Sequence, residues 1–142
     1  MYLRNLGPKI VLANQKDPKT HAKKMLNGKE YLDIAFEDFV RFVLKGENKD
    51  QHWNKQTLTC HICKYRFSYL GKFETMSRDA NQLFDLIGID IDRLPEDGQY
   101  SVDANALMRK YYDALPKGLI DQIYDFYIDD FNAFGYGRHD YF

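Results

Sequence analysis

The sequence predicts an α/β protein that is mostly helical, with about four helices and one or two strands. In four segments, apolar residues recur at the spacing of a helix, with glycine or proline near the ends of most of these segments. A fifth segment, residues 65–71, instead alternates aromatic and polar side chains as a strand does, and a helical segment follows it closely. A chain of 142 residues is long enough for one domain with a modest core, so we expect a single domain over 1–142.

The elements follow in order along the chain. Pro8, Pro18 and Gly28 interrupt the first 28 residues, so we expect a loop there with one short strand at 9–13. The strand predicted at 65–71 ends at a glycine. Helices are predicted at 33–45, 77–87, 101–115 and 116–131. The tyrosines and phenylalanines of the last helix recur at helical spacing, which indicates a role in the core.

Charge is unevenly spread, although the net charge is only −1. Residues 1–29 carry seven Lys or Arg and one acid, whereas the remainder carries thirteen Lys or Arg and twenty acids. This basic arm faces a polyanion, matches acids elsewhere in the protein, or forms a solvated and partly mobile tail. Because basic residues are confined to the arm and no nucleic-acid-binding module is recognised, we expect no nucleic-acid partner. The lysines concerned are Lys9, Lys16, Lys19, Lys23 and Lys24.

The apolar runs are too short to cross a bilayer, and no apolar segment typical of a signal peptide precedes Pro8.

Both cysteines lie in one C-x-x-C, as Cys60 and Cys63. The spacing suits two zinc ligands, but a second close pair of ligands is missing, since His52 stands alone and His61 lies inside the turn. A redox-active pair needs its first sulfur at a helix N-terminus, whereas a strand is predicted after this pair. A structural role remains, either as a disulfide or as two small buried hydrophobes.

A longer motif surrounds the cysteines. It begins with His52-Trp53, continues through the C-x-x-C and Gly-Lys-Phe-Glu-Thr at 71–75, and ends with Asp-Ala-Asn at 79–81. This motif resembles the C-terminal half of the Golgi carbohydrate sulfotransferases, which include the chondroitin/dermatan 4-O-sulfotransferases and the HNK-1 sulfotransferase. Residues 35–44 and 123–136 are also similar to segments of that family, so the resemblance covers most of the chain.

The resemblance implies a P-loop-like α/β parent fold, of which this chain is the C-terminal, mostly helical part. It implies transfer of sulfate from PAPS (3′-phosphoadenosine 5′-phosphosulfate) to a hydroxyl of a glycan acceptor, such as a glycosaminoglycan or a glycoprotein glycan. It also implies the lumenal side of the Golgi, with membrane attachment only through an N-terminal anchor that is not in this sequence. The family's two PAPS-binding motifs, a basic loop and R-D-P-x-x-R, are not in the sequence either. We therefore expect a fragment that is inactive alone.

The resemblance also suggests roles for particular residues. His52 acts as the base or contacts the acceptor, or else it only hydrogen-bonds its own loop while Trp53 packs beneath it. Trp53, Lys72 and Glu74 are candidate substrate contacts, although a solvated lysine and a helix-capping glutamate are the alternatives. Cys60 and Cys63 become disulfide or structural residues, paired with each other or with cysteines elsewhere, and no metal is expected.

Two other functions compete with this one. The chain could be a relic that binds glycans without catalysis, having kept only the acceptor groove. Alternatively, it could be a small zinc-binding interaction module built on the C-x-x-C.

Overall fold

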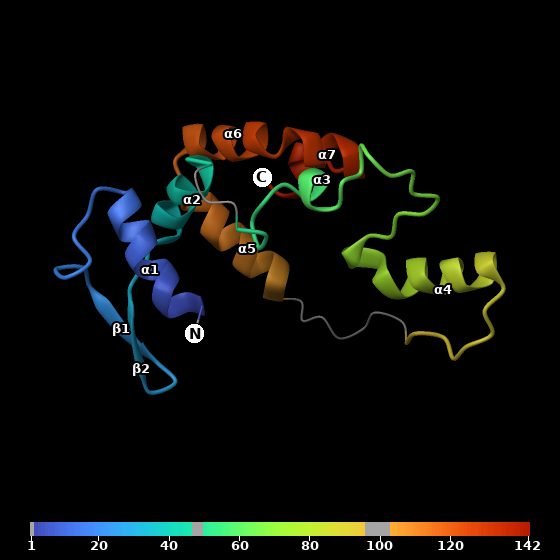
Figure 1. Ribbon diagram of the computed structural model, residues 1–142, viewed down its shortest axis with the longest axis horizontal. Helices are drawn as coiled ribbons and strands as arrows, with labels where there is room; N and C mark the ends of the chain where they lie inside the picture. The colour runs from blue at the N-terminus through green and yellow to red at the C-terminus, as the bar shows by residue number, and fades with distance from the viewer. Residues whose placement is uncertain (1, 47–49, 96–102) are drawn as a thin grey trace.

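The computed structural model describes residues 2–46, 50–95 and 103–142. Within these ranges the chain forms seven α-helices, two short 3₁₀ helices and one two-stranded sheet, a mostly helical α/β arrangement (Figure 1). In order, the elements are α1 (Tyr2–Ala13), β1 (Lys23–Leu26), β2 (Lys29–Leu32), α2 (Phe36–Leu44), α3 (Gln56–Thr59), η1 (Phe73–Thr75), α4 (Met76–Ile87), α5 (Asp103–Asp113), α6 (Lys117–Phe126), α7 (Ile128–Phe134) and η2 (Arg138–Asp140).

Each of the four segments predicted to be helical contains a helix, although α2 begins at Phe36 rather than near residue 33, and the described residues form more helices than expected. The segment predicted as one last helix divides at Tyr127 into α6 and α7. α4 ends as predicted, at Gly88 in the left-handed conformation. The expected start at Ser101 lies outside the described residues, and α5 is described from Asp103.

The strand predicted at 9–13 is wrong, because these residues belong to α1. Leu6, Ile10 and Ala13 recur at helical spacing and pack toward Phe42 and Val43 of α2. Burial of this face outweighs the hydrogen bond that Pro8 cannot donate inside the helix. Tertiary packing has therefore overridden the local signal of the proline.

A β-hairpin follows α1, and its two strands are antiparallel with Leu26 opposite Lys29. Asn27 and Gly28 form the turn with φ angles of 49° and 71°, which is the two-residue hairpin turn that Asn-Gly favours. The hairpin lies against α1 at Gly7, where a Cβ atom would be 3.4 Å from Cβ of Leu32. The absence of a side chain at Gly7 thus allows this close packing.

The strand predicted at 65–71 is also wrong. The segment contains no strand and runs in an open conformation, with Tyr65, Phe67 and Leu70 about half exposed. An alternating pattern forms a strand only where a neighbouring strand completes its hydrogen bonds, and the described residues offer none here.

The core lies on both sides of α2. Val40 packs with Leu115, Leu119 and Ile123 on one side. Residues Ile10, Phe42 and Val43 form a second cluster on the other side. The helix α2 therefore joins the α1–hairpin unit to the C-terminal helices.

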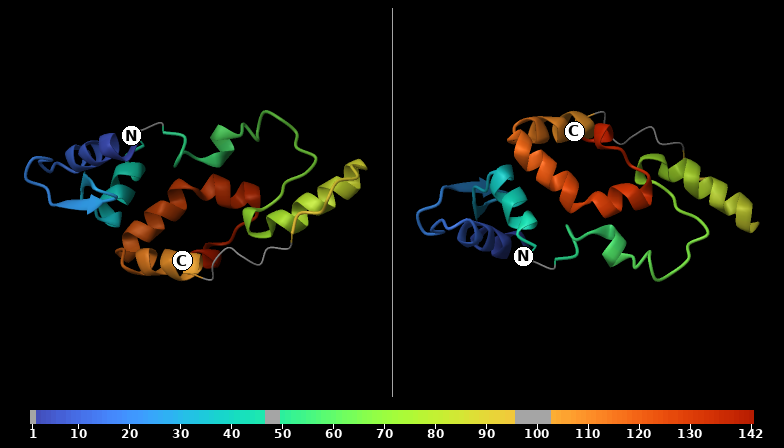
Figure 2. Two further views of the ribbon diagram at one scale, coloured as in Figure 1. Left: turned by 90° about the horizontal axis from the view of Figure 1, so that it is seen from below. Right: turned by 90° about the horizontal axis from the view of Figure 1, so that it is seen from above.

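The overall shape is elongated. The hairpin and α1 lie at one end, α6 and α7 span the middle, and α4 extends from the other end (Figure 2). The accessible surface is 11069 Å², whereas a compact monomer of this 16.8 kDa mass exposes about 7,700 Å². Large apolar side chains are exposed on and near α4, where Phe73, Leu86 and Ile87 are more than half exposed. None of the helices in the described ranges has the length and apolar character needed to cross a membrane.

Candidate functional site

The His-Trp pair lies in the loop between α2 and α3. Trp53 packs edge-on against Phe39 and Phe42 of α2, with ring centroids 5.4 and 6.2 Å apart. The hydroxyl of Tyr127 donates a hydrogen bond of 2.5 Å to the backbone carbonyl of Trp53. Burial raises the pKa of Tyr127 to about 12, so this hydroxyl stays protonated and remains a donor. The loop is thereby fixed to the core from two sides.

His52 is paired with a carboxylate that sequence reasoning missed. Its Nδ1 lies 2.6 Å from Oδ1 of Asp50, which also accepts the backbone N–H of His52 at 3.0 Å. These contacts, led by the backbone N–H, lower the pKa of Asp50 and keep it charged. A carboxylate on Nδ1 favours the tautomer whose Nε2 carries the lone pair. Asp50 could have been found from the sequence, because an acid two residues before a histidine can reach its ring.

A cleft of about 650 Å³ opens beside this pair. Its walls come from α1, the hairpin, α2, the His-Trp loop and α5, and they are mostly apolar. Among the described lining residues, polar groups come from Lys24, Tyr31, His52, Trp53 and Tyr111. An apolar cleft of this size with a few polar groups is typical of a small-molecule site. The imidazole of His52 is 71% exposed, so it is accessible to a ligand.

Lys72 and Glu74 do not line this cleft. The Lys72 ammonium lies 4.4 Å from the ring centroid of Tyr136 and donates to the backbone carbonyl of Gly135. Glu74 accepts hydrogen bonds from the hydroxyls of Tyr136 and Tyr141, at 2.9 and 3.1 Å. The two charged residues therefore bind the end of the chain to the segment before α4.

The pKa values in this cluster follow from those contacts. Burial acts to raise the pKa of Glu74, but a backbone N–H, the two phenols and Lys72 outweigh it, and the pKa is lowered. Burial, together with Glu74, raises the pKa of Tyr136 and of Tyr141. Glu74 is thus a carboxylate with two protonated phenols donating to it.

Asp79 organises the Gly-Lys-Phe-Glu-Thr turn. Its Oδ2 accepts the backbone N–H of Lys72 at 2.9 Å and the hydroxyl of Thr75 at 2.7 Å, and its Oδ1 lies 3.0 Å from Nε of Arg78. These contacts, led by the Lys72 N–H, lower its pKa from 3.8 to about 2. A Cβ atom on Gly71 would be 3.4 Å from Cβ of Asp79, so glycine suits the close approach. The turn motif therefore has a structural explanation that needs no ligand.

The cysteines are free thiols, and both are exposed. Their interpretation as small buried hydrophobes is wrong, and the structure contains no disulfide between them. Cys60 caps the C-terminal end of α3, which is the opposite end from the one that stabilises a thiolate. Among the described residues, no cluster of three or more His, Cys, Asp or Glu side chains is placed to hold a metal ion.

The basic arm is folded, and it matches acids within the chain. Ion pairs join Lys16 to Asp38 at 2.7 Å, Lys24 to Asp33 at 2.8 Å, and Lys23 to Glu30 within the hairpin at 2.9 Å. The interpretation of the arm as a mobile tail is therefore wrong for these lysines, and internal matching explains them.

The chain is similar in sequence to several known proteins. Residues 6–137 match the profile described as the sulfotransferase family. Carbohydrate sulfotransferase 9 of Homo sapiens is 30% identical over 127 residues, which cover 84% of this chain and 28% of that protein. Carbohydrate sulfotransferase 12 of Mus musculus is 26% identical over 112 residues, covering 75% of this chain and 27% of that protein. Carbohydrate sulfotransferase 11 of Mus musculus is 23% identical over 144 residues, covering 97% and 40%.

The chain thus spans between about a quarter and two fifths of the length of these relatives. No solved structure matches it.

Proposed function

The chain belongs to the sulfotransferase family, and from this membership we propose that it forms the C-terminal part of a carbohydrate O-sulfotransferase domain. The complete enzyme transfers sulfate from PAPS to a hydroxyl of a glycan, in the lumen of the Golgi. The observation that supports the proposal is the Asp50–His52 pair beside the cleft, because an imidazole oriented by a carboxylate at the edge of a cleft suits a general base for a bound acceptor.

His52 serves as the base for the acceptor. As the sugar oxygen bonds to the sulfur, the bond between the sulfur and the donor's phosphate oxygen breaks and the nucleotide leaves; the hydroxyl proton passes to Nε2 of His52, and Asp50 on Nδ1 stabilises the imidazolium that forms. Trp53 and the phenylalanines of α2 form an apolar wall against which the faces of a sugar ring pack. Lys72 and Glu74 act at a distance from this chemistry, by holding the C-terminal segment in place.

The cleft does not fit the sulfate donor. PAPS carries several negative charges, whereas the described lining residues include one ammonium, that of Lys24, which already pairs with Asp33 at 2.8 Å. None of these lining residues is therefore assigned a contact with the donor. We accordingly propose that these 142 residues bind the acceptor glycan and do not transfer sulfate by themselves.

The test is a sulfate-transfer assay with radiolabelled PAPS and a panel of unsulfated glycans, on the protein expressed from its native gene. Replacing the base by His52→Asn is expected to lower kcat by about 10²- to 10⁴-fold, the usual contribution of general-base catalysis. The Asp50→Asn variant should show a smaller loss, because it removes only the orienting charge.

His139→Asn is the matched control. His139 is also exposed and also lies beside an aspartate, with Nε2 3.3 Å from Oδ1 of Asp140, but it is remote in sequence and does not line the cleft. The sulfate-transfer activity of the His139→Asn variant should equal that of the wild-type protein. Full activity of His52→Asn would reject His52 as the base, and absence of transfer to every glycan would reject the enzyme assignment. Sulfate transfer by the isolated 142-residue chain would refute the proposal that this chain is inactive alone.

A further inference from the structure

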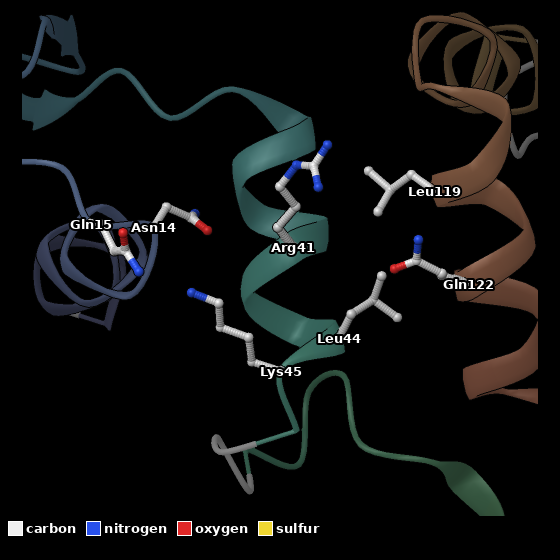
Figure 3. Close-up of a pocket in the computed structure, with 7 residues that line it drawn as sticks. All are labelled: Asn14, Gln15, Arg41, Leu44, Lys45, Leu119 and Gln122. Carbon is white, nitrogen blue, oxygen red and sulfur yellow. The ribbon is translucent and has the colours of Figure 1, made fainter.

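A second groove lies across α2 from the cleft. It has a volume of about 400 Å³ and runs between the C-terminal end of α1, α2 and α6 (Figure 3). The cleft uses Phe36 and Phe39 of α2, whereas this groove uses Arg41, Leu44 and Lys45. The full lining is Asn14, Gln15, Arg41, Leu44, Lys45, Leu119 and Gln122.

Among the described residues, the lining has two cations, Arg41 and Lys45, and Arg41 is paired with the carboxylate of Glu37. Arg41 has five N–H donors, of which Nε and Nη2 each direct one to Oε1 of Glu37, at 2.9 and 2.6 Å. Lys45 has three donors and gives one to the backbone carbonyl of Ala13. These contacts hold both side chains in place and leave five donor hydrogens, which suits a sulfate or carboxylate group.

The rest of the lining suits a sugar. Asn14 is fixed by donating its amide N–H to the carbonyl of Asp38 at 2.8 Å, which leaves its Oδ1 as an acceptor. The side-chain amides of Gln15 and Gln122 make no hydrogen bond within the described parts of the chain, and each offers both donors and an acceptor. Leu44 on α2 and Leu119 on α6 line opposite sides of the groove (Figure 3). Leu119 is buried, so the apolar contact comes mainly from Leu44.

We propose that this groove is a subsite for a sugar residue that carries a sulfate or carboxylate group. A neutral sugar leaves the donors of Arg41 and Lys45 unused, and a free inorganic anion leaves the amides and leucines unused. An anionic saccharide uses all three kinds of group. The inference rests on the proposed function insofar as the saccharide is a further unit of the acceptor glycan, bound away from His52.

The test measures binding to the 142-residue chain by calorimetry. Three probes are compared, a chondroitin sulfate hexasaccharide, the same oligosaccharide after desulfation and carboxyl reduction, and inorganic sulfate. The groove variant is Arg41→Gln with Lys45→Gln. Its matched control is Arg109→Gln with Lys110→Gln, which removes the same two charges from exposed positions on α5 outside the groove.

The sulfated hexasaccharide should bind more tightly than both other probes. The groove variant should weaken its Kd by at least about tenfold, because two charge-assisted contacts are lost, and the control should change it less than twofold. Gln122→Ala should weaken the hexasaccharide about threefold without changing the binding of inorganic sulfate. This single exposed substitution keeps the test decisive if the double variant fails to fold.

Equal weakening by the groove and control variants would overturn the proposal, because it would mean attraction by overall charge. Equal binding of the neutral oligosaccharide, or of inorganic sulfate, would also overturn it. Normal groove binding without any sulfate transfer would reject the proposed function alone, and normal transfer with groove-independent binding would reject the subsite alone.

Discussion

At the scale of single residues, two aspartates set the geometry of the motif: Asp50, which precedes it, and Asp79, which belongs to it. Asp50 orients His52. The carboxylate of Asp79 accepts hydrogen bonds from the Lys72 N–H, the Thr75 hydroxyl and the Arg78 guanidinium. Asp79 is only 8% exposed although it lies in the first turn of a helix that is otherwise largely exposed. The carboxylate of Asp79 therefore stays charged and stabilises the fold through these hydrogen bonds.

The lowered pKa of Asp79 predicts a pH dependence of stability. Because the pKa is about 2 in the folded chain and 3.8 ordinarily, the unfolded chain binds this proton more readily. The contribution of Asp79 is fully present above about pH 4 and is lost as pH falls toward 2. Asp79→Asn should lower the urea midpoint at pH 7, measured by circular dichroism, and should remove part of the change between pH 4 and 2.

Asp85→Asn is the control for this prediction, since it lies in the same helix and its carboxylate pairs with Arg93 in solvent. Exposed pairs contribute little, so its urea midpoint at pH 7 should hardly move. Identical pH profiles for wild type and Asp79→Asn would contradict the assignment to Asp79.

At the scale of elements, the β-hairpin brings residues of the basic arm to the cleft of the candidate site. Lys24, Leu26, Tyr31 and Leu32 all line the cleft beside His52. The turn at Asn27-Gly28 sets the register of the two strands and thereby the side of the hairpin that faces the cleft. The geometry of one cleft wall thus depends on a two-residue turn.

Substitution of the turn glycine tests that dependence. Gly28 has a φ of 71°, and no atom lies within 4 Å of the position that a Cβ would take, so Gly28→Ala introduces backbone strain without a clash. The hairpin should lose about 1 kcal/mol of stability, seen as faster hydrogen exchange of its amides. Gly118→Ala is the matched change in α6, where space is also open and φ is ordinary, and there alanine should stabilise by about 0.5 kcal/mol. Unchanged exchange in Gly28→Ala would contradict the assigned turn.

At the scale of the whole molecule, stability is unevenly distributed. The buried residues cluster around α2 and its partners α1 and α6, whereas α4 extends away from them with Leu86 75% exposed (Figure 1). The segment before α4 is attached mainly through Glu74 and Lys72 to the chain end. Regions with few buried apolar contacts open at low free-energy cost.

Hydrogen exchange measured by mass spectrometry should therefore separate the two ends of the molecule. Amides of α4 should exchange well before those of α2. Glu74→Gln should accelerate exchange in α4 and in residues 136–142, because it weakens acceptance from both tyrosine hydroxyls, without affecting α2. Equal protection of α4 and α2 would show that α4 is packed more firmly than this structure indicates.

Much of the secondary structure could be predicted from the sequence, because apolar spacing in 36–44, 76–87 and 117–134 is a local signal that survives folding. The family motif also identified His52, Trp53 and the 71–75 turn as a set. Two strands were predicted wrongly for opposite reasons. Residues 9–13 gained burial against α2 that favoured a helix, and residues 65–71 lacked the neighbour that a strand requires.

The sequence by itself determined the family, the helical segments and the loop that bears His52. Only the tertiary structure decided which motif residues meet. Glu74 accepts hydrogen bonds from Tyr136 and Tyr141, which are 62 and 67 residues away in the sequence. Lys72 lies beside Tyr136 and does not line the cleft next to His52. The division has a physical reason. Helical spacing and turns depend on neighbours within a few residues, whereas a cleft or a carboxylate–phenol cluster forms only when distant segments pack together.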